Sequence, residues 1–251
     1  MKKKENVNYR YVEQILENLI VSKQSFNLKG EPLVATGTIS LAEAHTIITL
    51  IKKQKFRATL ETGVAYGAST LAMCYALSLV SRTEQGQCLH LGVDPGQNKD
   101  YGGAAIAALK SAGLDSFFEL LEGSSHAMLP KLLLDGVKID LMFIDGWHTF
   151  DYTMIDMFYG DKLLRINGYM IMHDMYMRSK QKAFRWLLSH RHYRVVSLGQ
   201  DNLLRRFAAS LIWLLRGRAD VARSRLMGVR GLLVAEKLDD WEPPYDFFSA
   251  F

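Results

Sequence analysis

The sequence lacks the features of secreted, membrane-spanning and disulfide-rich proteins. Only two of its 251 residues are cysteines, Cys74 and Cys88, which are too few and wrongly spaced for a zinc site, and their apolar neighbours predict buried free thiols. No apolar stretch follows the basic start MKKKEN, so we do not expect a secretory signal. The apolar run 207–215 is about half the length of a membrane span. These absences predict a cytoplasmic protein.

Two phosphate-binding motifs are also missing. The loop LETGVAYGAST contains Gly63 and Gly67 in a G-x-x-x-G spacing. A dinucleotide fingerprint would read G-x-G-x-x-G, and a phosphate loop would carry a lysine after its second glycine. The loop therefore does not predict a phosphate cradle, although its glycines allow the backbone to approach a ligand closely.

The composition is that of a globular protein with a basic segment. Hydrophobic residues make up 49% and charged residues 23%, which is ordinary for a globular protein with a sizeable core. The length of 251 residues suits one large α/β domain, or one domain with appendages. The net charge is +5, and residues 205–230 contain seven arginines against one acid, Asp220. This segment is either a solvated helical face or a surface for an anionic partner or a membrane.

Strands and helices are expected to alternate after an initial helical part. Apolar spacing predicts helices at 9–21 and 40–55, the second opened by a capping box of Ser40 and Glu43. Strands are expected at 57–60, 88–93, 118–122, 139–144, 169–172 and 193–197, and helices at 69–81, 101–112, 127–135, 150–164 and 180–189.

This alternation predicts an α/β fold with a doubly wound, mostly parallel, Rossmann-like sheet. A helix near 202–216 and a late strand at 231–238 are expected to follow, and the strand is a candidate antiparallel last strand. We expect an N-terminal helical cap at 1–56, and a Rossmann-like domain at 57–251 with a basic helical insertion at about 200–230.

Ligands in such a sheet bind beyond the carboxyl ends of the strands, so the residues that end each strand are the candidates. The first strand leads into the glycine loop, and the second ends at Asp94, placed as an acid that accepts hydrogen bonds from ribose hydroxyls. Ser124 and Ser125 follow the third strand. Each of these also has an ordinary structural explanation as a turn glycine or a helix cap.

The fourth and fifth strands carry the strongest pattern. The sequence FIDGWH puts Asp145 at the end of a buried strand with His148 after it, and MIMHD puts His173 and Asp174 at the end of the next strand. Carboxylate and imidazole groups are suitable ligands for a divalent metal, and a histidine suits a general base. Capping alone is a poor explanation for four such groups at neighbouring strand ends.

With these motifs assembled, the chain resembles the class I S-adenosylmethionine-dependent methyltransferases. Within them it is most similar to the O-methyltransferase branch of macrocin-type sugar and cephalosporin-biosynthesis enzymes. The resemblance covers roughly residues 40–198 and rests on LETGVAYGAST, GVDP, LEGSS, FIDGWHTFDY and LLRINGYMIMHD.

The resemblance implies S-adenosylmethionine as cofactor and assigns a role to each candidate. Glu61, Gly63 and Gly67 would hold its methionine end, with Ser69 opening the helix behind them, and Asp94 would bind the ribose. Ser124 and Ser125 would flank the adenine. Asp145 and Asp174 would match the family's ligands for Mg²⁺ or another divalent cation, and His148 would be the base for the substrate hydroxyl.

The chain departs from this family at two places. Asn167-Gly168 replaces the usual glycine pair before the fifth strand. His173 and Met175 flank Asp174, where metal-dependent relatives often carry a second acid or an amide. In one interpretation, His173 is a third metal ligand. In the other, the site works without a metal, and His148 or His173 is the base. Asp145 would then orient a histidine or the cofactor.

Two other functions stay open beside transfer to a small-molecule hydroxyl. A nicotinamide-type oxidoreductase fits the glycine loop and Asp94, but the dinucleotide fingerprint G-x-G-x-x-G is missing. A nucleic-acid methyltransferase fits the basic segment, but base-directed enzymes often carry an Asn/Asp-Pro-Pro-aromatic motif where this chain reads DGWH. We therefore expect a small-molecule acceptor and no nucleic acid, with residues 205–230 as a candidate for peripheral membrane contact or homo-oligomer formation.

Overall fold

The chain folds into two compact α/β units. The computed structural model describes residue 7 and residues 9–196, 211–212, 214–215 and 231–251. The units comprise residues 1–128 and 129–251, and the division falls inside helix α5 (Ser125–Leu134). Among the described residues, no helix has both the length and the apolar character needed to cross a membrane.

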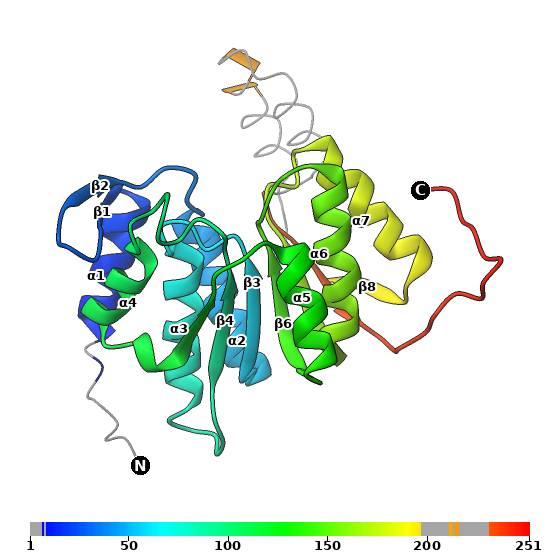
Figure 1. Ribbon diagram of the computed structural model, residues 1–251, viewed down its shortest axis with the longest axis horizontal. Helices are drawn as coiled ribbons and strands as arrows, with labels where there is room; N and C mark the ends of the chain where they lie inside the picture. The colour runs from blue at the N-terminus through cyan, green and yellow to red at the C-terminus, as the bar shows by residue number, and fades with distance from the viewer. Residues whose placement is uncertain (1–6, 8, 197–210, 213, 216–230) are drawn as a thin grey trace. The chain divides into compact units, whose positions relative to one another are not determined.

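The first unit contains three parallel strands with β4 between β3 and β5. Its helices α1 to α4 pack against one another (Figure 1), and α3 is buried over almost its whole length. The elements of this unit are α1 (Tyr9–Ile20), β1 (Gln24–Phe26), β2 (Pro32–Val34), α2 (Leu41–Gln54), β3 (Ala58–Thr62), α3 (Ala68–Val80), β4 (Leu89–Val93), α4 (Ala104–Ala112), a 3₁₀ turn (Asp115–Phe117) and β5 (Phe118–Leu121).

Local sequence explains much of the N-terminal part. The predicted capping box is confirmed, because the Ser40 hydroxyl accepts the Glu43 N–H and the Glu43 carboxylate accepts the Ser40 N–H. The antiparallel hairpin β1–β2 was not predicted, since helices and loops were expected here. Its strands have only three residues each, too few to show a period, and its turn depends on Gly30, whose φ is +82°.

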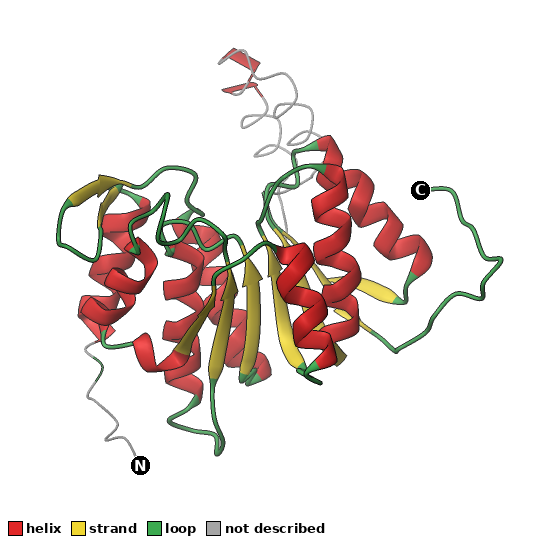
Figure 2. Ribbon diagram, viewed as in Figure 1, coloured by secondary structure: helices red, strands yellow, loops and turns green. Residues whose placement is uncertain are grey.

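In the described part of the second unit, four strands lie in the order β6-β7-β9-β8, and helices flank them (Figure 2). Strand β9 runs antiparallel to both β7 and β8, whereas β6 and β7 are parallel. Besides α5, its elements are β6 (Ile139–Ile144), α6 (Phe150–Leu163), β7 (Leu164–Met172), α7 (Arg178–His190), β8 (Tyr193–Val196) and β9 (Leu233–Lys237). The predicted fold class, a mostly parallel Rossmann-like sheet flanked by helices with an antiparallel last strand, is thereby confirmed.

Strand β7 begins earlier than predicted. The Asn-Gly pair at 167–168 predicted a turn between a helix and a strand that starts at 169, but α6 ends at Leu163 and β7 starts at once. The pairing with β6 shifts register here, Asn167 has a left-handed φ of 64°, and a Cβ on Gly168 would lie 2.7 Å from the carbonyl oxygen of Arg165. The pair therefore forms an irregularity within the strand.

The two cysteines are buried free thiols, as predicted. Cys74 lies on α3, where burial and the nearby carboxylate of Glu61 raise the pKa of its thiol well above the ordinary value. Such a thiol is a packing residue and a poor nucleophile at neutral pH.

Most of the basic segment at 205–230, and most of the helix expected near 202–216, lie outside the described residues. Its four described residues, Leu211, Ile212, Leu214 and Leu215, are helical with exposed side chains. The membrane and self-association roles of this segment stay predictions.

Candidate active site

The glycine loop joins β3 to α3 in the first unit. Gly63 and Gly67 both have a φ of 85°, in the left-handed region that favours glycine. At Gly67, a Cβ would also lie 2.6 Å from the Cβ of Ala105 on α4. Helix α4 therefore approaches the backbone too closely for any side chain at this position.

Asp94, at the end of β4, holds this loop in place. Its Oδ2 accepts the backbone N–H groups of Val64 and Ala65 at 2.9 and 2.8 Å, and its Oδ1 accepts that of Gly96 at 2.8 Å. The carboxylate is 5% exposed, and three of its roughly four acceptor positions are filled. The ribose contact stays a prediction, and the structure adds a role in shaping the loop.

Gln97 also holds the loop in place. This buried amide donates to the carbonyl oxygen of Ala65 at 2.8 Å and accepts from the backbone N–H of Ala105 at 3.2 Å. It therefore links the glycine loop to the start of α4. Gln97, three residues after Asp94, was not predicted as a site residue from the sequence.

Glu61 lies at the centre of a fully buried polar network. Its carboxylate accepts from the hydroxyls of Ser69, at 2.6 Å, and Thr70, and lies 3.0 Å from Nε2 of His90. The other ring nitrogen of His90 lies 2.9 Å from the Thr59 hydroxyl. Glu61 and Ser69 are thus partners of each other, and their contact with a cofactor stays a prediction.

Ser124 and Ser125 begin helix α5. The carbonyl oxygen of Ser124 accepts the N–H groups of Ala127 and Met128, so Ser124 takes the position just before the helix. Ser125 is its first residue and is buried. Their place beside an adenine ring stays a prediction.

The second unit brings the two acids and two histidines together, as the sequence predicted. Ile144 pairs with Met172 in the parallel register of β6 and β7, so Asp145 and His173 leave neighbouring strands at the same end. Nδ1 of His173 lies 3.0 Å from Oδ1 of Asp145 and 3.5 Å from Oδ1 of Asp174. Asp174 has a left-handed φ of 55°, an unfavourable conformation typical of functional sites.

His148 lies between the two carboxylates. Its Nδ1 is 4.0 Å from Oδ1 of Asp145, and its Nε2 is 3.8 Å from Oδ2 of Asp174. Both separations exceed hydrogen-bond length, so neither nitrogen is committed to a carboxylate. Burial, followed by the charge of Lys180, lowers the pKa of His148, although the two carboxylates oppose this shift. The side chain is 40% exposed, so a substrate can reach it.

Lys180, on α7, is a member of the site that the sequence analysis missed. Its Nζ donates to Oδ1 of Asp145 at 3.3 Å, and the residue is 1% exposed. The buried residues of α7 include Lys180, Ala183, Phe184 and Leu187, which share one helical face. A lysine at an apolar position of an amphipathic helix was the available signal.

A divalent metal has a partial fit to this cluster. One ligand atom each from Asp145, His148 and Asp174 lies within 4.8 Å of the others, so His148 joins the two acids where His173 was predicted. The donor types suit a divalent ion. However, the Oδ1 atom of Asp145 already faces the ammonium group of Lys180 and Nδ1 of His173. A metal would therefore lie beside a buried positive charge.

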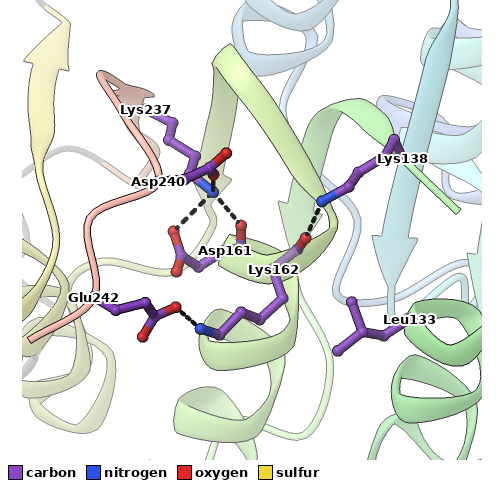
Figure 3. A pocket seen from close by; sticks show the side chains of 7 residues that line it. All are labelled: Leu133, Lys138, Asp161, Lys162, Lys237, Asp240 and Glu242. Carbon is purple, nitrogen blue, oxygen red and sulfur yellow. Dashed lines mark hydrogen bonds and ion pairs between the residues drawn. The ribbon is translucent and has the colours of Figure 1, made fainter. Parts of the chain in front are cut away.

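A separate cavity of about 230 Å³ lies near the amino end of β7, away from these residues (Figure 3). The Lys237 ammonium donates to the carbonyl oxygens of Asp161 and Leu164, Lys162 pairs with Glu242, and Lys138 donates to the carbonyl oxygen of Lys162. Opposite charges here satisfy one another, so we assign the cavity a structural role.

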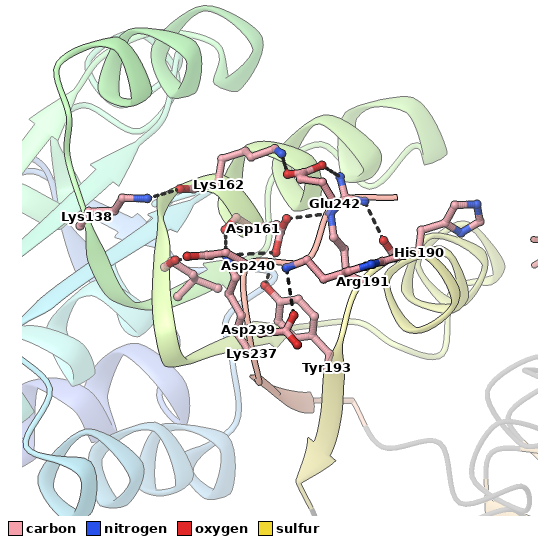
Figure 4. Close-up of polar contacts among 12 residues, drawn as sticks. Lys138, Asp161, Lys162, His190, Arg191, Tyr193, Lys237, Asp239, Asp240 and Glu242 are labelled. Carbon is pink, nitrogen blue, oxygen red and sulfur yellow. Dashed lines mark hydrogen bonds and ion pairs between the residues drawn. The ribbon is translucent and has the colours of Figure 1, made fainter. Parts of the chain in front are cut away.

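Asp161 anchors the C-terminal segment beside this cavity (Figure 4). It accepts from Nε of Arg191 and the hydroxyl of Tyr193, both at 2.8 Å, and its Oδ1 lies 3.4 Å from Nζ of Lys237. Burial and the Asp161 carboxylate raise the pKa of Tyr193 well above its ordinary range. The network joins α6, β8 and β9 with buried charges.

Residues 60–175 match the family model of a methyltransferase domain. This range contains the glycine loop, Asp94, both serines and the cluster at the ends of β6 and β7. No curated protein gives a significant match to the chain.

Solved structures share the fold at low sequence identity. An O-methyltransferase from Bacillus cereus, solved in complex with S-adenosylhomocysteine, superposes with a TM-score of 0.60 at 13% identity, over 94% of this chain and 93% of its own. The O-methyltransferase TomG from Streptomyces achromogenes, involved in tomaymycin synthesis and solved with S-adenosylmethionine, gives a TM-score of 0.61 at 14% identity, over 94% and 92%. These structural likenesses support the shared fold, and the macrocin-type branch stays a prediction.

Proposed function

We propose that this protein transfers a methyl group from S-adenosylmethionine to a hydroxyl oxygen of a small molecule. The observation that carries the proposal is the position of His148 between Asp145 and Asp174, within the segment that matches a methyltransferase domain. When bound, S-adenosylmethionine supplies a methyl group on a sulfonium sulfur. The task left to the protein is to orient the acceptor and to remove its proton.

His148 is suited to take that proton. A lowered pKa keeps the imidazole neutral near pH 7, so a lone pair is available. A ring nitrogen of His148 would accept the proton of the acceptor hydroxyl, so that the oxygen is free to take up the methyl group. Asp145 and Asp174 then stabilise the imidazolium that has formed.

The first unit supplies the groups for the cofactor. Asp94 and Gln97 fix the loop that contains Gly63 and Gly67, so that its backbone is preorganised for close approach by a ligand. Beyond its hydrogen bonds to the loop, Asp94 retains about one acceptor position for a ribose hydroxyl. We propose this loop as the cofactor-binding element, with Ser124 and Ser125 at the next strand end.

An exposed aromatic residue next to the proposed base bears on the acceptor class. Trp147 is 72% exposed and directly precedes His148. An indole open to solvent favours an acceptor with a planar or apolar portion beside its hydroxyl. A phenol or a hydrophobic natural-product intermediate therefore suits this site better than a highly charged acceptor.

Calorimetric titration of the full chain with S-adenosylhomocysteine tests the cofactor. We expect micromolar affinity. With labelled S-adenosylmethionine, we also expect transfer of the labelled methyl group to one member of a panel of phenols and sugars. Binding of a nicotinamide dinucleotide in place of S-adenosylhomocysteine would replace this proposal with the oxidoreductase. Label found on amine acceptors alone would keep the methyl transfer and overturn the oxygen specificity.

A further inference from the structure

Lys180 places a buried positive charge against Asp145. Its Nζ lies 3.3 Å from Oδ1 of the acid, and its side chain shares the buried face of α7 with Ala183, Phe184 and Leu187. A lysine this enclosed cannot extend its ammonium group into water, as surface lysines do. It must be balanced by a charge inside the protein, and Asp145 is in position to do this.

A divalent ion at this cluster would depend on the same carboxylate. The three ligand atoms close enough to share an ion come from Asp145, His148 and Asp174. An ion bound by Asp145 would lie within a few ångströms of the Lys180 ammonium, and like charges at that distance repel strongly in a partly buried site. The lysine therefore meets the demand for positive charge that a metal would otherwise meet.

We propose that Lys180 is the built-in cation of this site and replaces a divalent metal. It orients Asp145, holds the carboxylate cluster together electrostatically and keeps divalent ions out. Lys180 is a positioning residue that acts through Asp145 and His148. This inference rests on the proposed function only in taking the cluster as the acceptor site.

Manganese alone is the probe. Binding of Mn²⁺ to the full chain is measured from the electron paramagnetic resonance signal of the free ion. For the unaltered protein we expect affinity weaker than about 1 mM, outside the range of dedicated divalent-ion sites. In Lys180→Met, which keeps an unbranched side chain one heavy atom shorter and removes the charge, we expect binding to tighten by about tenfold or more. Adding Asp145→Asn to this variant should abolish the gain.

Lys182→Met is the matched control. Lys182 lies two residues away on the same helix, and its Nζ lies over the ring of Phe251. This variant also removes one lysine charge, but at a position away from Asp145, so we expect no gain in Mn²⁺ affinity. An equal gain in Mn²⁺ affinity in both variants would show that the change in net charge alone causes it, and would overturn the proposal.

Two further outcomes would overturn it. Micromolar Mn²⁺ binding by the unaltered protein that disappears in Asp145→Asn would show a working metal site beside Lys180. A folded Lys180→Met that gains no affinity would show that the lysine does not exclude the ion. If Lys180→Met does not fold, the measurement on the unaltered protein decides, with Lys180→Arg as a charge-preserving variant that should still exclude Mn²⁺. Titration of the same samples with S-adenosylhomocysteine tests the proposed function separately.

Discussion

Oδ2 of Asp94 accepts the backbone N–H of Ala65 at 2.8 Å, and Ala65 has a left-handed φ of 45°. The acid thus stabilises an unfavourable backbone conformation in the loop proposed to bind the cofactor. Its neighbour Gln97 holds the carbonyl oxygen of the same residue. Any test of Asp94 as a cofactor ligand must therefore separate contact with the ligand from support of the loop.

Asp94→Asn is expected to weaken S-adenosylhomocysteine binding by about 10- to 100-fold, because an amide lacks the charge and one of the acceptors that serve three N–H groups. Loss of loop support should also lower the thermal unfolding temperature of the protein without ligand. Calorimetry and thermal unfolding of the same sample measure both. An affinity loss with unchanged stability would assign Asp94 to ligand contact alone. The exposed Asp115→Asn should change neither quantity.

His148→Ala is expected to lower the turnover of methyl transfer by about 100-fold or more, because the proton acceptor is lost. Affinity for S-adenosylhomocysteine should stay within about twofold, since the imidazole is assigned to the acceptor and not to the cofactor. Single-turnover label transfer and calorimetry measure the two effects. His45→Ala, at an exposed position of α2, is the control. Equal losses in turnover and cofactor affinity would make His148 a structural residue.

Much of the cluster at the ends of β6 and β7 could be predicted, because the ends of buried strands can be located in the sequence. Buried strands appear as apolar runs, and the polar residues that follow parallel neighbours must emerge at the same edge of the sheet. That reasoning placed Asp145, His148, His173 and Asp174 together, and the structure confirms that they are neighbours. The sequence could not show which histidine lies between the two carboxylates, because this depends on the course of the loop between β6 and α6.

Other features depend on backbone geometry that leaves little trace in residue types. The course of the glycine loop decides whether three backbone N–H groups reach the Asp94 carboxylate. From the sequence alone, this acid could therefore be either a ribose ligand or an anchor for the loop. Lys180 was read as an ordinary helix residue, because a lysine usually faces solvent. The short hairpin β1–β2 lacked enough residues for a period to emerge.

The acid limb of the pH–rate profile should have its midpoint below the ordinary histidine pKa. Burial, followed by Lys180, lowers the pKa of His148, and the base works only when neutral. Activity should therefore rise with pH through this lowered pKa and be level at neutral pH. In Lys180→Met the lowering charge is gone, so the midpoint should move to higher pH. A midpoint that stays in place, or moves lower, would contradict the assignment of His148 as the titrating base.

Gly67→Ala is expected to lower the free energy of unfolding by about 2–5 kcal/mol, measured by urea titration. Two costs combine at this position: alanine disfavours a φ of +85°, and its Cβ would lie 2.6 Å from the Cβ of Ala105. Gly30→Ala separates them, because Gly30 has a φ of +82° with nothing within 4 Å of a Cβ. That variant should lose only about 1–2 kcal/mol. If the two variants lost equal stability, close packing against α4 would not be what requires glycine at position 67, and the backbone conformation alone would account for it.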